Sequence, residues 1–146
     1  MKNLFSVLIL IISGCATLPP NWINAYEGHA LPDEQVAKLI HNFSNYREVL
    51  YIDGAHYIKS YGDARNHFNL LPGIHEIQYY LRWHKEGFVV GTARLEMKAG
   101  HVYVLSHDVH SGWLPKNQYA TVIIRDETTS EVVHEDTFIE PTYYEP

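Results

Sequence analysis

The residues best suited to chemistry lie close together in the second half of the chain, at His107, Asp108 and His110. Imidazole and carboxylate groups are common ligands of zinc and copper, so this spacing raises a metal site as a hypothesis. In a regular strand, however, Asp108 and His110 point to one side and His107 to the other. Only a bend after Asp108 would bring all three together. We therefore expect no metal, and a metal-binding or pH-sensing protein remains an alternative.

A hydrolase is a second alternative, because Ser106, His107 and Asp108 are the residue types of a catalytic triad. Consecutive strand residues alternate between the two faces, so these three cannot form the required relay. The sequence also contains neither a G-x-S-x-G motif nor a glycine-rich phosphate loop. We expect that the protein is not an enzyme.

Aromatic residues give the clearest indication of binding. The chain has 3 Trp and 11 Tyr, and Trp113 lies between Gly112 and Leu114 in a predicted loop shortly before Tyr119. An exposed aromatic ring can stack on a sugar or anchor a protein contact. The alternative for Trp113 is a lid over the core. We take Trp113 and Tyr119 as the candidate binding surface.

A hydrophobic period of two runs through most of the chain and predicts strands. In the longest, residues 74–84, His75, Ile77 and Tyr79 share one face, while Glu76 and Gln78 share the other. The predicted strands are 47–52, 57–61, 74–84, 88–97, 101–108, 119–126 and 131–136. Their hairpin spacing predicts a mainly β domain, an antiparallel β-sandwich of about six or seven strands in undetermined order.

One short amphipathic helix is predicted before the strands, over residues 32–42. Val36, Leu39, Ile40 and Phe43 follow the i, i+3, i+4, i+7 spacing of a helical face. Pro32 suits a first helical turn, and the two acidic residues after it complement the helix dipole.

The first 15 residues have the order of a secretory signal. Lys2 precedes an apolar run over residues 4–12, which ends at Ser13-Gly14-Cys15. This ending resembles the lipobox of bacterial lipoproteins. The resemblance implies cleavage before Cys15, a covalent lipid on Cys15 as the only attached group, and, with Ala16 following, the outer membrane of a Gram-negative bacterium.

The expected organisation is a signal peptide at 1–14, a lipidated tether at 15–30, one domain at 31–140 and a tail at 141–146. The chain has 146 residues, of which 46% are hydrophobic and 19% charged, as in a folded domain. Cys15 is its only cysteine, and its net charge of −6 argues against nucleic acid as a partner.

Two segments resemble a known group of envelope proteins. Residues 70–77 (LLPGIHEI) and 95–105 (LEMKAGHVYVL) are similar to paired segments of PEGA-type and transthyretin-like β-sandwiches, and of small uncharacterised proteobacterial lipoproteins. The resemblance implies a surface-binding or structural role. Within the second segment, Tyr103 is expected to bury its ring and to form a hydrogen bond between its hydroxyl and a backbone group.

The leading hypothesis is a lipid-anchored, non-enzymatic β-sandwich of the cell envelope that binds or scaffolds another envelope component. Its expected partners are the membrane, through the lipid on Cys15, and an envelope protein or glycan.

Overall fold

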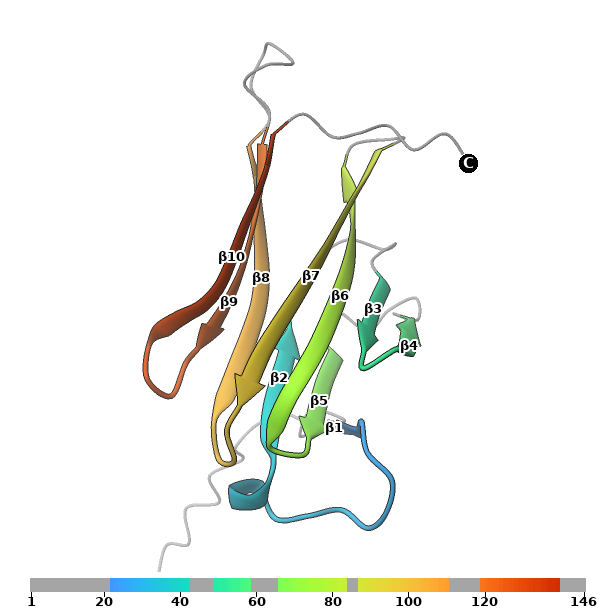
Figure 1. Ribbon diagram of the computed structural model, residues 1–146, viewed down its shortest axis with the longest axis vertical. Helices are drawn as coiled ribbons and strands as arrows, with labels where there is room; N and C mark the ends of the chain where they lie inside the picture. Colours follow the sequence, from blue (N-terminus) through green and yellow to red (C-terminus); the bar gives the residue numbers. More distant parts are fainter. Residues whose placement is uncertain (1–21, 43–48, 59–65, 84–86, 111–118, 140–146) are drawn as a thin grey trace, which may run out of the picture.

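The computed structural model of the chain describes residues 22–42, 49–58, 66–83, 87–110 and 119–139 (Figure 1). Most residues in these ranges belong to ten strands joined by short turns. The strands are β1 (Trp22–Asn24), β2 (Ala37–His41), β3 (Val49–Ile52), β4 (Ala55–Ile58), β5 (Asn66–Leu70), β6 (Gly73–Trp83), β7 (Gly87–Met97), β8 (Val102–His110), β9 (Tyr119–Asp126) and β10 (Glu131–Ile139). The prediction of a mainly β protein is confirmed.

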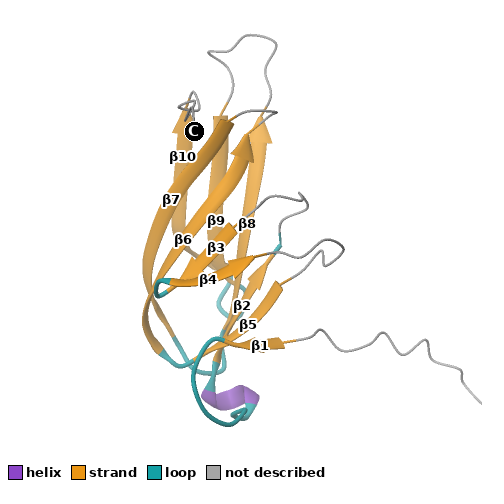
Figure 2. Ribbon diagram, turned by 90° about the vertical axis from the view of Figure 1, so that its right-hand side faces the viewer, coloured by secondary structure: helices purple, strands orange, loops and turns teal. Residues whose placement is uncertain are grey.

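The strands form two sheets, which lie against each other along the long axis of the molecule (Figures 1 and 2). The larger sheet has six strands in the order β1-β5-β2-β8-β9-β10, and the smaller has four in the order β4-β3-β6-β7. Two pairs, β1 with β5 and β2 with β8, run parallel. The other neighbouring strands of the described chain run antiparallel, as predicted.

The hairpin of β6 and β7 is the longest regular feature, with 11 residues in each strand. Ile77 and Tyr79 of β6 are completely buried, whereas Glu76 is exposed, so the predicted alternation is confirmed. Gly91 of β7 lies opposite Tyr79. A Cβ at position 91 would lie 2.3 Å from the Tyr79 ring, so only glycine lets this ring pack across the hairpin.

Side chains from both sheets contribute to one apolar core. Its buried members are Ala37, Leu39, Leu50, Ile52, Phe68, Leu70, Ile77, Tyr79, Ala93, Leu95, Met97, Tyr103, Leu105, Ala120, Val122 and Ile124. Full burial of one large apolar side chain stabilises a fold by about 1.5–3 kcal/mol. Tyr103 buries its ring here, and its hydroxyl accepts a hydrogen bond from the Lys98 backbone N–H at 3.0 Å, as predicted.

The predicted helix over residues 32–42 is wrong. Asp33–Gln35 makes a single 3-10 turn, closed by a hydrogen bond from the Gln35 N–H to the Pro32 carbonyl at 2.9 Å. The chain then forms β2, which is paired with β5 on one side and β8 on the other. A short helix has little stability of its own, so two ladders of backbone hydrogen bonds outweigh a helical spacing of apolar residues.

Three strands, β1, β2 and β5, were not predicted, so the described chain has ten strands where six or seven were expected. β1 has only 3 residues and falls inside the segment expected to be the tether. β5 has the sequence NHFNL, and its asparagines disfavour a strand in isolation. Both are held by pairing with strands distant in sequence.

The strand directions give the molecule two distinct ends. At the lower end in Figure 1 lie β1 and the turns that join β5 to β6 and β7 to β8, and we call this the near end. The ends of β8 and β10 and the start of β9 lie at the upper end, which we call the distal end (Figures 1 and 2). Within the described ranges, no helix is long and apolar enough to cross a membrane.

Candidate functional site

β8 carries all three residues of the suspected metal cluster. It runs as a regular strand through His110, so Asp108 and His110 share its outer side, as the alternation predicts. His110 Nε2 lies 3.0 Å from Asp108 Oδ2, and these side chains are 49% and 72% exposed. His107 projects to the other side, and burial lowers the pKa of its imidazole while the charge of Asp108 opposes this shift.

The structure brings Asp108 and His110 together and leaves His107 apart. Two ligands are fewer than the three or four of a convincing zinc site. In the part of the chain that the structure describes, no group of three or more His, Cys, Asp or Glu residues is placed to hold a metal ion.

Tyr119 begins β9 directly beside the end of β8. Its ring stacks on the His110 imidazole, with centroids 4.3 Å apart and planes 22° from parallel, and Tyr119 remains 38% exposed. On its other side Tyr119 is paired with Ile139 of β10, which is 72% exposed. An imidazole, a phenol ring and an aliphatic chain therefore form one row across three strands.

A second row, of polar side chains, lies next to this one, two residues further from the distal end on each strand. Asp108 is paired with Thr121 of β9, which is paired in turn with Thr137 of β10. The hydroxyls of Thr121 and Thr137 are 3.4 Å apart. We call the two rows together the distal patch, with the members His110, Tyr119, Ile139, Asp108, Thr121 and Thr137. Its make-up is typical of a contact surface, because apolar area lies beside groups that can form directional hydrogen bonds.

Two candidate residues from the sequence analysis lie outside the residues that the structure describes. These are Trp113, the other member of the predicted binding surface, and Cys15, the predicted site of lipidation. The distal patch is thus defined by β8, β9 and β10. Ile139 was missed from the sequence because its cross-strand pairing with Tyr119 depends on hairpin register.

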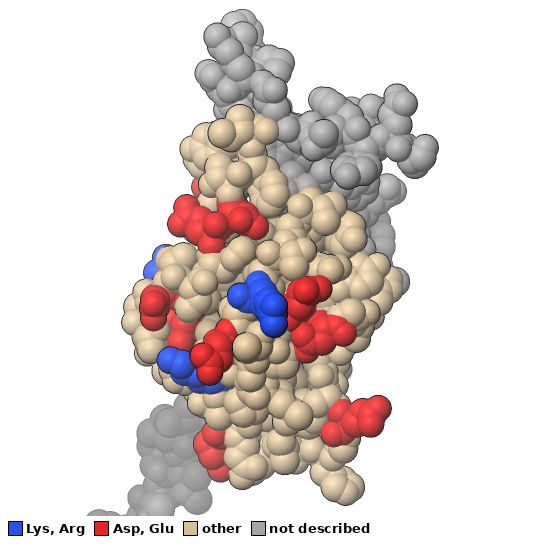
Figure 3. All heavy atoms as spheres, viewed as in Figure 1, with Lys and Arg blue, Asp and Glu red and all other residues tan. Residues whose placement is uncertain are grey.

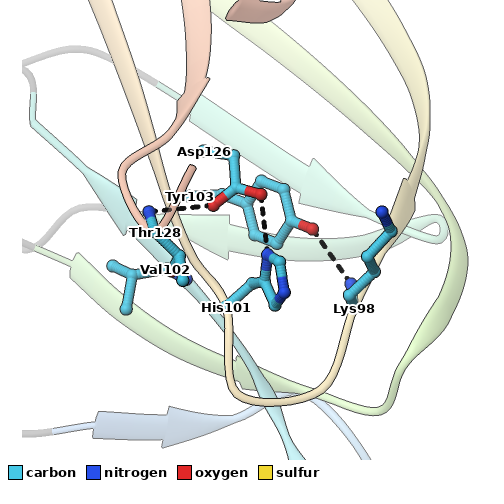
Figure 4. Close-up of polar contacts among 6 residues, drawn as sticks. All are labelled: Lys98, His101, Val102, Tyr103, Asp126 and Thr128. Atoms are coloured by element: carbon cyan, nitrogen blue, oxygen red, sulfur yellow. Dashed lines mark hydrogen bonds and ion pairs between the residues drawn. The ribbon is translucent and has the colours of Figure 1, made fainter. Parts of the chain in front are cut away.

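A polar cluster at the other end of the β8–β9 pair was also missed (Figure 4). Asp126 is only 4% exposed, and it accepts hydrogen bonds from His101 Nδ1 at 2.7 Å and the Thr128 N–H at 3.0 Å. Burial alone would raise the pKa of Asp126, but these hydrogen bonds outweigh it and bring the pKa below its usual value. The cluster fixes the turn that follows β9.

A third polar cluster joins the two sheets. The Tyr79 hydroxyl of β6 donates to Asp136 Oδ2 of β10 at 2.5 Å, and His134 Nε2 lies 3.1 Å from the same oxygen. Burial, together with the hydrogen bond and charge of Asp136, raises the pKa of Tyr79, so its hydroxyl stays a donor. A phenol fixed as a donor inside the core ties the sheets together and is a poor nucleophile.

The turn between β3 and β4 carries a fourth cluster. Asp53 and Gly54 both have positive φ angles, 51° and 79°, which confirms the Asp-Gly turn that the sequence indicates. The Asp53 carboxylate accepts hydrogen bonds from the Glu76 N–H at 2.9 Å and from His75 Nδ1 at 2.6 Å. The cluster attaches this turn to β6, which is a structural role.

No protein-family model matches the chain, and neither a curated protein nor a solved structure matches it significantly. Of the four clusters, three are engaged in holding turns or sheets together. The distal patch is the one that presents apolar and polar groups to solvent, and we take it as the candidate functional site.

Proposed function

We propose that this protein is a lipid-anchored, non-enzymatic component of the bacterial cell envelope that binds another envelope component through the distal patch. Its domain would be a β-sandwich, an interpretation supported by two sheets that share one core. The partner would be an envelope protein or a glycan.

The observation that carries this proposal is the exposed row of His110, Tyr119 and Ile139. Large apolar side chains that lie side by side on regular strands expose an apolar surface that a partner would bury. Tyrosine is enriched among the residues that dominate binding energy, because its ring buries much surface and its hydroxyl forms a hydrogen bond. The neighbouring carboxylate and two hydroxyls would orient the partner.

The anchor is supported by the sequence order of charge, apolar run and Ser13-Gly14-Cys15. Two or three acyl chains on one cysteine make a stable anchor, whereas one chain binds a membrane only marginally. The outer membrane, on its periplasmic face, is the proposed address, because Ala16 rather than aspartate follows the cysteine. Replacing Cys15 with serine should abolish incorporation of a fatty-acid probe in growing cells; a labelled Ser variant would overturn the anchor.

In-cell photocrosslinking tests the binding function. A photoreactive amino acid at Ile139, in the distal patch, should give one discrete adduct with a protein or with glycan. The matched control is the same amino acid at Thr92 of β7, an exposed position in the other sheet. If position 139 gives no adduct, or the same adducts as position 92, the distal patch is not the binding surface.

A further inference from the structure

β1 joins the N-terminal segment firmly to the domain. The Trp22 ring packs edge-on against His67 of β5 with centroids 4.7 Å apart, and Lys38 Nζ lies 4.8 Å from the centre of the same Trp22 ring. The Asn69 side chain donates a hydrogen bond to the Asn24 side chain at 3.0 Å. Trp22–Asn24 is therefore part of the folded body.

The segment between the proposed lipid and this strand is short. Residues 16–21 separate Cys15 from Trp22. A fully extended chain spans at most about 3.6 Å per residue, so these seven steps reach about 25 Å. The 11 residues of β6 alone extend about 35 Å. A tether shorter than the domain keeps the region around β1 close to the bilayer.

Exposed apolar side chains gather near this point of attachment. Ile23 of β1 is 38% exposed, Leu71 in the β5–β6 turn is 45% exposed, and Ile74 at the start of β6 is 64% exposed. Leu71 follows two residues after Asn69, whose side chain holds Asn24. β1 and the β5–β6 turn both lie at the near end of the molecule (Figures 1 and 2).

We propose that Ile23, Leu71 and Ile74 rest on the lipid bilayer that holds the anchor, so that the near end faces the membrane and the distal patch faces away. This inference depends on the proposed lipidation of Cys15. Isoleucine and leucine side chains suit the boundary between lipid headgroups and acyl chains. A contact of three side chains is small. The short tether favours it, because a protein already anchored by its lipid holds these side chains at a high effective concentration near the bilayer.

Charge at the near end indicates which lipids suit this contact. Acidic residues outnumber basic ones in the chain, 17 to 11. On the face seen in Figure 3, acidic side chains are spread widely. Near β1, Lys38 forms an ion pair with Asp33 at 2.5 Å, so its charge is already engaged within the protein. A bilayer rich in zwitterionic phosphatidylethanolamine should therefore hold the near end better than one rich in anionic phosphatidylglycerol.

Fluorescence quenching by lipid tests this orientation directly. The lipidated protein has no free thiol, because Cys15 is its only cysteine, so an engineered cysteine carries a unique label. Bimane would be attached to Leu71→Cys, Ile74→Cys or Tyr119→Cys protein in phosphatidylethanolamine vesicles containing nitroxide lipid. Labels at 71 and 74 should lose fluorescence and the label at 119 should not. Equal quenching at the three positions, or none, would overturn the orientation.

A matched pair of double variants tests whether the apolar side chains make the contact. With the label at Ile23→Cys, Leu71→Ser together with Ile74→Ser should reduce quenching. The control, Val90→Ser together with Val132→Ser, removes side chains that are 44% and 39% exposed elsewhere, and should leave quenching unchanged. Equal effects of the two double variants would contradict the proposed surface.

Vesicle flotation separates failure of the anchor from failure of this inference. Protein that does not float with vesicles would overturn the lipid anchor and the orientation together. Protein that floats while its near-end labels stay unquenched would overturn the orientation alone. Near-end labels that quench one another instead, with no lipid quencher present, would show that a second copy covers this surface.

Discussion

Two pairs of aspartate and histidine lie at opposite ends of the β8–β9 ladder and differ mainly in burial. At the near end, His101 Nδ1 is 2.7 Å from Asp126 Oδ2, and these side chains are 23% and 6% exposed. At the distal end, His110 Nε2 is 3.0 Å from Asp108 Oδ2, with exposures of 49% and 72%. The same chemical groups at almost the same distance therefore stand in different environments.

This difference in burial decides what each pair does. The carboxylate of Asp126 has left water, so the hydrogen bonds from His101 and Thr128 replace its hydration and lock the turn. The carboxylate of Asp108 remains exposed to water, and an exposed contact of this kind contributes about 0–1 kcal/mol to stability. The near-end pair maintains the fold, while the distal pair remains available to a partner.

The largest contrast in stability is expected between the two aspartates, each replaced in turn. Asp126→Ala should lower the free energy of unfolding by about 2–3 kcal/mol, because hydrogen bonds to a charged group are lost and their donors stay behind. Asp108→Ala should change it by less than about 0.5 kcal/mol. Urea unfolding of both variants measures the contrast. Similar losses would show that burial does not distinguish the pairs.

A smaller contrast is expected between two tyrosine hydroxyls. Tyr103→Phe leaves the Lys98 N–H without its hydrogen-bond acceptor and should cost about 1 kcal/mol. Tyr119→Phe, at the exposed end of the same ladder, should be nearly neutral for stability. Thermal melts of the two variants check this, and a larger loss for Tyr119→Phe would reverse the assignment of roles.

The smallest effect concerns His107, which lies on β8 between the two pairs and faces the opposite side. Because burial lowers its pKa below the ordinary 6.5, the unfolded chain binds a proton more readily than the folded one. Its contribution to stability is therefore complete above pH 6.5 and declines as the pH falls through that value. His107→Gln should flatten this part of the melting-temperature profile. A steeper decline in His107→Gln would contradict the sign.

Local signals were enough to predict the hairpin of β6 and β7, the Asp53-Gly54 turn and the partner class of the Tyr103 hydroxyl. In each case, the determining information lies within a few residues: period-two alternation, a turn dipeptide and an amphipathic side chain in a strand. The split of His107 from Asp108 and His110 follows from the same period.

Long-range pairing explains what the sequence could not provide. β2 has a helical spacing of apolar residues, and only its neighbours β5 and β8 make it a strand. Tyr79 and Asp136 are 57 residues apart, and His101 and Asp126 are 25 apart, so no short motif reveals either hydrogen bond. Ile139 joins Tyr119 through the register of one hairpin, with a shift between Val132 and His134.

The most direct measurement of the central claim combines binding with stability at the distal patch. With the photoreactive amino acid at Ile139, Tyr119→Ala should abolish most of the crosslinked adduct in cells while lowering the melting temperature far less than Asp126→Ala does. Thr92→Ala, on the other sheet, should leave both quantities unchanged. An undiminished adduct in the Tyr119→Ala variant would contradict the assignment of the distal patch as the binding surface.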